Sequence, residues 1–167
     1  MEATMLDDQK LKALFKYDAG TGEIYWIAVG KGKIKKKPAG TVISTGYVGI
    51  LIDGKRYLAH RITWALVHGT WPEQQIDHIN GVKTDNRIEN LRLATNAQNG
   101  KNYGANKTNT SGIKGVSWCK QTQKWRAMIK VDGKSICKGR YSDKQGALMA
   151  RHAAEIEHFG EWRRSCH

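Results

Sequence analysis

Cysteines, acidic side chains and long apolar runs are all scarce in this chain of 167 residues. Its three cysteines lie far apart and are odd in number, which argues against a disulfide framework or a paired-cysteine zinc site and favours reduced thiols. No segment approaches the roughly 18–20 apolar residues of a membrane-spanning helix, so we expect no membrane partner. The first ten residues lack the basic start and apolar stretch of a secretory signal, so we expect a cytoplasmic protein.

The 15 acidic residues face 28 lysines and arginines, which gives a formal net charge of +13. The excess is concentrated in residues 105–142, where nine basic side chains accompany the single acid Asp132. A separate run at 31–37 has five lysines in seven positions, and it predicts a mobile loop able to touch phosphates. A chain this basic usually binds a polyanion, although scattered lysines are also typical of an ordinary solvated surface.

Apolar periodicity and turn residues predict an α+β fold made of two units, residues 1–104 and 113–167, joined by a polar linker at 105–112. In the first unit we expect a helix over 6–16, a strand over 23–26, a hairpin of 47–52 and 55–58 turning at Asp53-Gly54, and a helix over 58–68 ended by Gly69. In the second we expect strands over 113–120, 124–131 and 134–141. A capping box at Ser142–Gln145 then begins a helix to about His158, with Met149, Ala150, Ala153 and Ile156 on one stripe.

The segment 76–102 holds the side chains best suited to chemistry. Asp77–Ile79 can form a strand, Leu91–Leu93 a returning strand, and Thr95 with Gln98 a capping box that begins a helix. A helix packed across these strands can bring Asp77, His78 and Asn99 to one point. Because neighbouring strand residues point to opposite faces, the aspartate and the histidine approach that point from two sides.

Each of these residue types suits one role in phosphate chemistry. The Asp77 carboxylate and the Asn99 amide oxygen are hard ligands of the kind that Mg²⁺ prefers. His78, which titrates near neutrality, can take the proton of an attacking water. Taken singly, an Asp-His pair beside a turn is more often a surface pair, and Asn99 a surface amide. Asn90 suits a structural role, bonding the backbone across the loop.

The same spacing resembles that of the HNH (His-Asn-His) nucleases with a ββα-metal fold, and most closely the phage homing endonucleases. The resemblance spans about 58–102 and rests on these groups: His60-Arg61, Gly69…Pro72, Asp77–Gly81, Asp85-Asn86-Arg87, Asn90-Leu91-Arg92 and Asn99…Asn102. It implies a metal-dependent endonuclease that hydrolyses phosphodiester bonds of double-stranded DNA, acting in a bacterial or phage-infected cell. Residues 1–57 would then be an N-terminal extension of the nuclease domain.

The resemblance also implies roles for individual residues. Asp77 and Asn99 would hold the divalent metal, His78 would be the general base, and Asn90 would fix the loop geometry. An asparagine at the last metal position favours Mg²⁺, or Mn²⁺, over a softer metal. No structural zinc is expected, because no cysteine pair is present to hold it.

Residues 110–162 resemble the ethylene-response-factor type DNA-binding domain of plant transcription factors, a three-stranded sheet backed by one helix. The resemblance is carried by these groups: Ser111–Trp118, Lys124–Ala127, Gly139-Arg140-Tyr141, Ala147…Ala150 and Phe159–Trp162. Alternation in the segment 124–131 independently predicts a basic face and an apolar face that packs on the helix. A basic sheet face can enter the major groove of DNA.

Candidate DNA contacts are the basic and polar side chains of both units: His60, Arg61, Arg87, Arg92, Lys114, Ser117, Trp118, Lys120, Arg126, Lys130, Lys138 and Arg140. For His60 the alternative is a packing role, and for Trp118 a partly buried hairpin anchor. Two alternative functions stay open: a non-catalytic, sequence-specific DNA-binding regulator with a degenerate nuclease fold, and a protein that binds or cleaves RNA. The chain is expected to act as a monomer or weak dimer.

Overall fold

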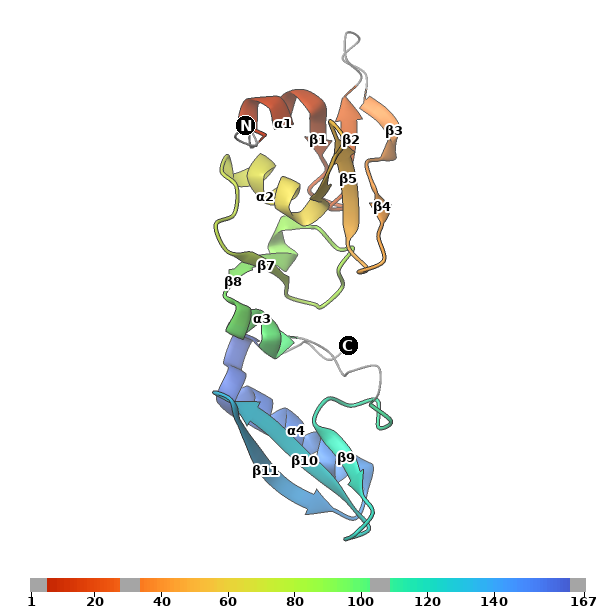
Figure 1. Ribbon diagram of the computed structural model, residues 1–167, viewed down its shortest axis with the longest axis vertical. Helices are drawn as coiled ribbons and strands as arrows, with labels where there is room; N and C mark the ends of the chain where they lie inside the picture. The colour runs from red at the N-terminus through yellow and green to blue at the C-terminus, as the bar shows by residue number, and fades with distance from the viewer. Residues whose placement is uncertain (1–5, 28–33, 103–108, 163–167) are drawn as a thin grey trace. The chain divides into compact units, whose positions relative to one another are not determined.

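The computed structural model describes residues 6–27, 34–102 and 109–162 (Figure 1). The chain divides into two compact units, Met1–Asn99 and Gly100–His167. Each unit combines helices with antiparallel sheets, which confirms the predicted α+β fold class. Among the described residues, no helix has both the length and the apolar character needed to cross a membrane. Half of the predicted linker, residues 105–108, lies outside the described ranges.

The first unit is built from short strands and three helices. Its elements are α1 Asp8–Leu14, β1 Phe15–Tyr17, β2 Ile24–Ile27, β3 Ile34–Pro38, β4 Thr41–Val42, β5 Val48–Ile52, β6 Lys55–Leu58, α2 Ala59–His68, β7 Gln75–His78, the 3₁₀ turn η1 Ile88–Asn90, β8 Leu91–Ala94 and α3 Asn96–Asn102, which continues into the second unit. The sheets have the strand orders β1-β2-β3, β4-β5-β6 and β7-β8.

The turn residues of the first unit act as the sequence predicts. Asp53 and Gly54 both have positive φ, 50° and 76°, as a type I′ hairpin turn requires. Gly69 ends α2 in the left-handed conformation, with φ of 73°.

The predicted mobile loop at 31–37 is partly wrong. Residues 34–37 belong to strand β3, because Ile34 pairs with Ile27 of β2 and Pro38 pairs with Tyr25. Residues 31–33 lie outside the described ranges. A lysine-rich sequence is therefore accommodated at the edge of a sheet, where charged residues are common.

One apolar core joins the N-terminal elements to helix α2. Leu11 of α1, Ile24 of β2 and Ile62 of α2 are at most 2% exposed and belong to the same cluster as Ile50 of β5. Burying these side chains against one another is the main stabilising term for so small a unit. The N-terminal segment is thus part of the body that carries the chemistry-bearing hairpin β7–β8.

The second unit is a three-stranded antiparallel sheet covered by one helix (Figure 1). Its elements are β9 Val116–Cys119, β10 Lys124–Val131, β11 Lys134–Tyr141, α4 Lys144–Phe159 and the 3₁₀ turn η2 Gly160–Trp162. Ala127 and Ile129 of β10 are buried beneath the helix, whereas Lys124 and Lys130 are exposed. The predicted alternation of an apolar and a basic face along β10 is confirmed.

The face of helix α4 that packs on the sheet is not the face that carries its larger apolar residues. Met149 and Ile156 are 65% and 52% exposed, whereas Ala147 and Ala154 are buried. The small side chains let the helix backbone lie close to the sheet. Between helix and sheet, the buried Arg151 donates a hydrogen bond of 2.8 Å to the Met128 carbonyl of β10. The close approach of the backbones favours alanine over larger apolar residues at this interface.

The N-terminus of α4 is capped by Asp143, not by Ser142 as the capping box predicts. The Asp143 carboxylate accepts a hydrogen bond of 2.7 Å from the Gly146 amide. The helix begins one residue later than the box suggests, because a carboxylate at this position satisfies a free amide and also interacts favourably with the helix dipole.

We predict that Asp143→Ala lowers the free energy of unfolding by about 1 kcal/mol, the usual cost of losing an N-cap side chain. Ser142→Ala, at the neighbouring position, should change it by less than about 0.5 kcal/mol. Urea denaturation of the two variants and the parent measures both values. Equal losses, or a larger loss for Ser142→Ala, would contradict this assignment of the cap.

Candidate active site

Strands β7 and β8 form a hairpin that carries Asp77 and His78 at the end next to its connecting loop. Asp77 pairs across the hairpin with Arg92, and His78 pairs with Leu91. Both Asp77 and His78 are only 4% exposed. Because they are neighbours in a strand, their side chains leave opposite faces of the hairpin, and the two faces make different contacts.

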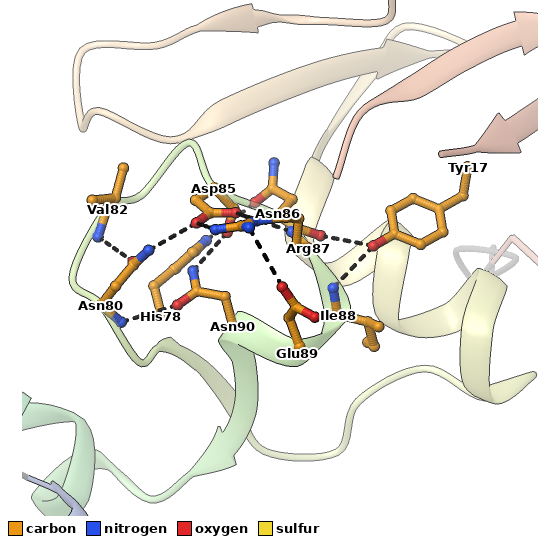
Figure 2. A network of polar contacts seen from close by, with 10 residues as sticks. All are labelled: Tyr17, His78, Asn80, Val82, Asp85, Asn86, Arg87, Ile88, Glu89 and Asn90. Carbon is orange, nitrogen blue, oxygen red and sulfur yellow. Dashed lines mark hydrogen bonds and ion pairs between the residues drawn. The ribbon is translucent and has the colours of Figure 1, made fainter. Parts of the chain in front are cut away.

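Asn90 closes the loop between the two strands (Figure 2). Its side-chain oxygen accepts a hydrogen bond of 3.0 Å from the Asn80 amide, and its side-chain nitrogen donates one of 2.8 Å to the Asp85 carbonyl. Asn90 is 6% exposed, so both bonds are sheltered from water. One side chain thereby ties together two parts of the loop that lie five residues apart.

Asp85 organises the other side of this loop. Its carboxylate accepts hydrogen bonds from Arg87 Nε at 2.9 Å and Nη2 at 2.7 Å, and another from Asn80 Nδ2 at 2.8 Å. The bond from the Arg87 guanidinium is the main cause that lowers the pKa of Asp85 to about 2. The forked geometry of the guanidinium matches a carboxylate, so Arg87 is engaged inside the loop.

His78 is held by the side chain of Asn86. The distance between His78 Nε2 and Asn86 Oδ1 is 3.1 Å (Figure 2), and Asn86 is 4% exposed. An amide oxygen can only accept, so this bond places the imidazole proton on Nε2 and the ring lone pair on Nδ1. The arrangement selects the tautomer in which Nδ1 is the basic nitrogen.

Three rings pack together on the His78 face of the hairpin. The ring centroids of Tyr47 and His60 are 5.1 Å apart, those of His60 and His78 are also 5.1 Å apart, and those of Tyr47 and His78 are 5.8 Å apart. The two histidines meet edge to face, an arrangement favoured between aromatic rings. The rings of Tyr47 and His60 cover one side of the His78 imidazole.

Burial in this cluster favours the neutral form of both histidines. Burial is the main cause that lowers the pKa of His60 to about 3, and the nearby charges of His78 and Arg61 add to it. Burial also lowers the pKa of His78, against the opposing effect of its bond to Asn86. A neutral imidazole can accept a proton.

The opposite face of the hairpin carries Asp77 and its neighbours. Arg92 Nε and Nη2 both lie 2.9 Å from Asp77 Oδ2, which gives the buried carboxylate a counter-charge. Asn99 of α3 donates a hydrogen bond of 2.8 Å to Gln75 Oε1. Gln75 precedes Asp77 by two residues in β7, so it lies on the same face, and the bond directs the Asn99 amide to that face.

This donor set fits a hard divalent cation. The Asp77 carboxylate and the Asn99 amide supply oxygens, which suit Mg²⁺ or Mn²⁺ better than softer metals. Within the described ranges, no group of three or more His, Cys, Asp and Glu side chains could hold a metal ion. An ion held by these two residues would have its further ligand positions open to water and to a phosphate oxygen, as is usual for Mg²⁺.

The predicted DNA contacts of the first unit are engaged within it. Arg61 donates hydrogen bonds to the carbonyls of Pro72 at 2.8 Å and Gln74 at 3.2 Å, so it ties α2 to the segment before β7. Arg87 and Arg92 pair with carboxylates, as described. His60 is 5% exposed, which contradicts a surface contact with phosphate. Its ring packs against Tyr47 and His78, as the alternative role predicted.

In the second unit, strand pairing decides which predicted DNA contacts share a face. Ser117 and Arg140 both lie directly opposite Arg126, so the three form a row on the face away from α4. Lys130 follows on the same face, two alternations further along β10. Lys120, just beyond β9, is exposed.

Three other predicted contacts are directed elsewhere. Lys138 lies at a register shift in β11 and pairs with Glu157 of α4 at 3.0 Å, so it is off the open face. Lys114 donates hydrogen bonds to the carbonyls of Gly100 at 3.2 Å and Lys101 at 3.4 Å. Trp118 lies opposite Trp125 with ring centroids 5.3 Å apart, which places it on the helix side although it is 46% exposed.

Sequence reasoning missed three residues that shape the site: Tyr17, Tyr47 and Asn86. Asn86 stands within the motif that carries the family resemblance, but nothing in its local sequence shows which side chain it bonds. Tyr17 and Tyr47 reach the site from strands and turns far away in the chain. No local signal could identify them, because their contacts exist only in the folded unit.

Comparison with known proteins finds a family similarity that covers the hairpin. Residues 57–101, from β6 to α3, match the HNH endonuclease family model. Protein 3.8 of Escherichia phage T7 is 40% identical over 76 residues, and the match covers 45% of this chain and 63% of that protein. The chain thus spans less than two thirds of this relative.

One solved structure is similar over most of the chain. It concerns DNA binding and cleavage by the HNH homing endonuclease I-HmuI, and it superposes with a TM-score of 0.41 and 20% identity over 90% of this chain and 87% of that one. The family match ends at Lys101. The resemblance of residues 110–162 to the plant DNA-binding domain therefore stays a prediction.

The contact between the N-terminal hairpin and the site loop gives a prediction about glycine. Gly22 has φ of 76°, and a Cβ atom there would lie 2.7 Å from the Asn86 carbonyl carbon and closer still to the Arg87 nitrogen. Gly54 has the same φ of 76° with nothing within 4 Å. Alanine at either position should cost about 1–2 kcal/mol for the left-handed backbone.

We predict that Gly22→Ala costs a further 1–3 kcal/mol or so, because the loop must move to accommodate the methyl group. Chemical denaturation of Gly22→Ala and Gly54→Ala isolates this term, since the backbone penalty is common to both. Equal losses of unfolding free energy would show that the hairpin does not press against residues 86 and 87.

Proposed function

We propose that this chain is an HNH homing-type endonuclease that hydrolyses phosphodiester bonds of duplex DNA with the help of one divalent metal ion. The observation that carries the proposal is the hydrogen bond between His78 and Asn86. It places a proton on Nε2 and leaves Nδ1 basic in an imidazole that burial keeps neutral on one face of the hairpin, while Asp77 and Asn99 would supply oxygens on the other. The family match of residues 57–101 supports the same conclusion.

In the proposed reaction, Nδ1 of His78 takes a proton from a water molecule as the water oxygen attacks phosphorus. The bond between phosphorus and the 3′ oxygen breaks, and that oxygen takes a proton from solvent. The products are a 5′-phosphate and a 3′-hydroxyl. Asn86 holds the imidazole in the required tautomer during the transfer, and Asn90 keeps the loop closed around it.

The metal would be held by Asp77 and Asn99, with Mg²⁺ the preferred ion and Mn²⁺ a substitute. When bound, it supplies positive charge to the phosphate and to the leaving oxygen. Arg92 orients the Asp77 carboxylate from the side through its Nε and Nη2 contacts. A single site of this kind acts on one strand at a time, so we propose that a monomer nicks duplex DNA.

The second unit is proposed to anchor the enzyme on DNA. Its three strands contain no acidic residue, and the face away from α4 presents Lys124, Arg126, Lys130 and Arg140. A sheet face of this charge can lie against the sugar-phosphate backbone or enter the major groove. Such phosphate contacts release counterions and make binding depend on salt.

We predict that His78→Ala lowers the rate of DNA cleavage about a hundredfold or more, the usual contribution of a general base. His68→Ala is the matched control, because His68 is exposed at the end of α2, and it should cleave at the parent rate. Conversion of supercoiled plasmid, and of a diverse pool of duplex fragments, is followed with Mg²⁺ or Mn²⁺. If the parent binds DNA but never cleaves it, the non-catalytic regulator replaces this proposal.

We predict that the double variant Lys124→Gln, Lys130→Gln binds duplex DNA more weakly and with a salt slope reduced by about 1.8, since each phosphate that a lysine neutralises adds roughly 0.9 to the slope. The control variant Lys16→Gln, Lys55→Gln removes the same charge from exposed strand positions of the first unit. Fluorescence anisotropy at several salt concentrations measures the slopes. Identical slopes for both variants would exclude the open face as an anchor.

A further inference from the structure

We propose that Tyr17, in the N-terminal sheet, is a positioning residue of the nuclease site. Its hydroxyl fixes the short loop segment from which Asn86 reaches His78, so the N-terminal sheet sets the orientation of the proposed base. The inference rests on the proposed function, since it concerns His78 as the proton acceptor. It gives residues that precede the HNH domain a specific part in the reaction.

The Tyr17 hydroxyl bonds to two main-chain groups of the loop. It donates to the Asn86 carbonyl at 3.3 Å and accepts from the Ile88 amide at 2.9 Å (Figure 2). These two groups flank Arg87, at the point where the loop enters η1. One hydroxyl therefore spans the turn and fixes both of its sides.

Asn86 links this contact to the imidazole. Its main-chain carbonyl accepts from Tyr17, while its side-chain oxygen lies 3.1 Å from His78 Nε2. Asn86 is 4% exposed, as is His78, so this path from Tyr17 to His78 lies inside the unit. A shift of the Asn86 backbone would move the acceptor that selects the His78 tautomer.

Tyr17 is itself rigidly placed. It ends strand β1 and pairs with Ile24, and the neighbouring Phe15 and Ile24 are 3% and 2% exposed in the core. The turn that follows is closed by a 2.8 Å hydrogen bond from the Gly22 amide to the Asp18 carbonyl. Gly22 in turn has no room for a side chain against Asn86 and Arg87. The β1–β2 hairpin thus meets the loop at two points.

The protonation state of Tyr17 agrees with this role. Burial is the main cause that raises the pKa of the phenol, so the hydroxyl keeps its proton at neutral pH and can donate to a carbonyl. A phenolate would repel the Asn86 carbonyl oxygen.

The test compares Tyr17→Phe with Tyr25→Phe in the full chain. Each variant loses one hydroxyl from the same sheet and keeps its ring, but the Tyr25 hydroxyl bonds to Glu23 at 2.6 Å. The ring nitrogens of His78 are followed by ¹⁵N NMR in metal-free protein without DNA, with His78→Ala used to assign the signals. We expect the Nε2–H tautomer in the parent and in Tyr25→Phe, and a mixture of tautomers in Tyr17→Phe.

Cleavage kinetics give a second readout. Tyr17→Phe should lower kcat about tenfold and leave KM for DNA unchanged, because only the transition state uses the aligned imidazole. Tyr25→Phe should match the parent in both parameters. An unchanged tautomer together with an unchanged kcat in Tyr17→Phe would overturn the inference.

A double-mutant cycle separates positioning from a general loss of packing. If Tyr17 acts through Asn86, the variant Tyr17→Phe, Asn86→Ala should have the same kcat as Asn86→Ala alone. Additive losses of kcat would assign Tyr17 a merely structural role and overturn the inference. If the parent protein never cleaves DNA but Tyr17→Phe still changes the His78 tautomer, the proposed function is rejected, whereas the link between Tyr17 and His78 stands.

Discussion

The alternation of side chains along strand β7 is the constraint on which the candidate site depends. Asp77 and His78 are adjacent, so the strand sends a carboxylate to one face and an imidazole to the other. On the first face, Arg92 bonds to the carboxylate, and Asn99 bonds to Gln75 of the same strand. On the second, Asn86 bonds to the imidazole, and burial among the rings favours its neutral form. The strand thereby separates the carboxylate from the neutral imidazole, although the two residues are adjacent in the chain.

Such a site demands a well-ordered loop, because several of its polar groups are buried. A buried polar side chain without a partner is costly, whereas a fully satisfied network stabilises a single arrangement. Asn90 and Asp85 supply the partners within the loop, and Tyr17 supplies one from outside it. The small nuclease motif is therefore ordered by the unit around it, including the shared core of α1, β2, β5 and α2.

The sequence was informative wherever short-range chemistry decides the structure. The Asp-Gly pairs at 53–54 and 132–133 take the positive φ angles of hairpin turns, and the fold class follows from these turns and from periodicity. The packing of α4 was not predictable from its apolar stripe, since the distance between helix and sheet favoured Ala147 and Ala154 over Met149. A one-residue register shift at Lys138 likewise turned a predicted open-face lysine toward Glu157.

The candidate site shows the same difference between what short-range sequence predicts and what only the folded chain decides. Asp77, His78, Asn90 and Asn99 stand out because residue type and spacing are visible in one short segment. Their partners do not, because a guanidinium that suits a phosphate equally suits a carboxylate. Only the folded hairpin shows that Arg92 pairs with Asp77. Tyr17 lies 69 residues before Asn86, beyond the reach of any local pattern.

Locating the metal ion tests the proposed site most directly. Crystals of the full chain bound to duplex DNA and soaked in Mn²⁺ would reveal the ion by anomalous scattering. We expect one strong peak within bonding distance of an Asp77 carboxylate oxygen, the Asn99 amide oxygen and a DNA phosphate oxygen, with His78 on the other side of that phosphate. A peak bound elsewhere, or a cation near the scissile phosphate that neither Asp77 nor Asn99 touches, would contradict the proposed site.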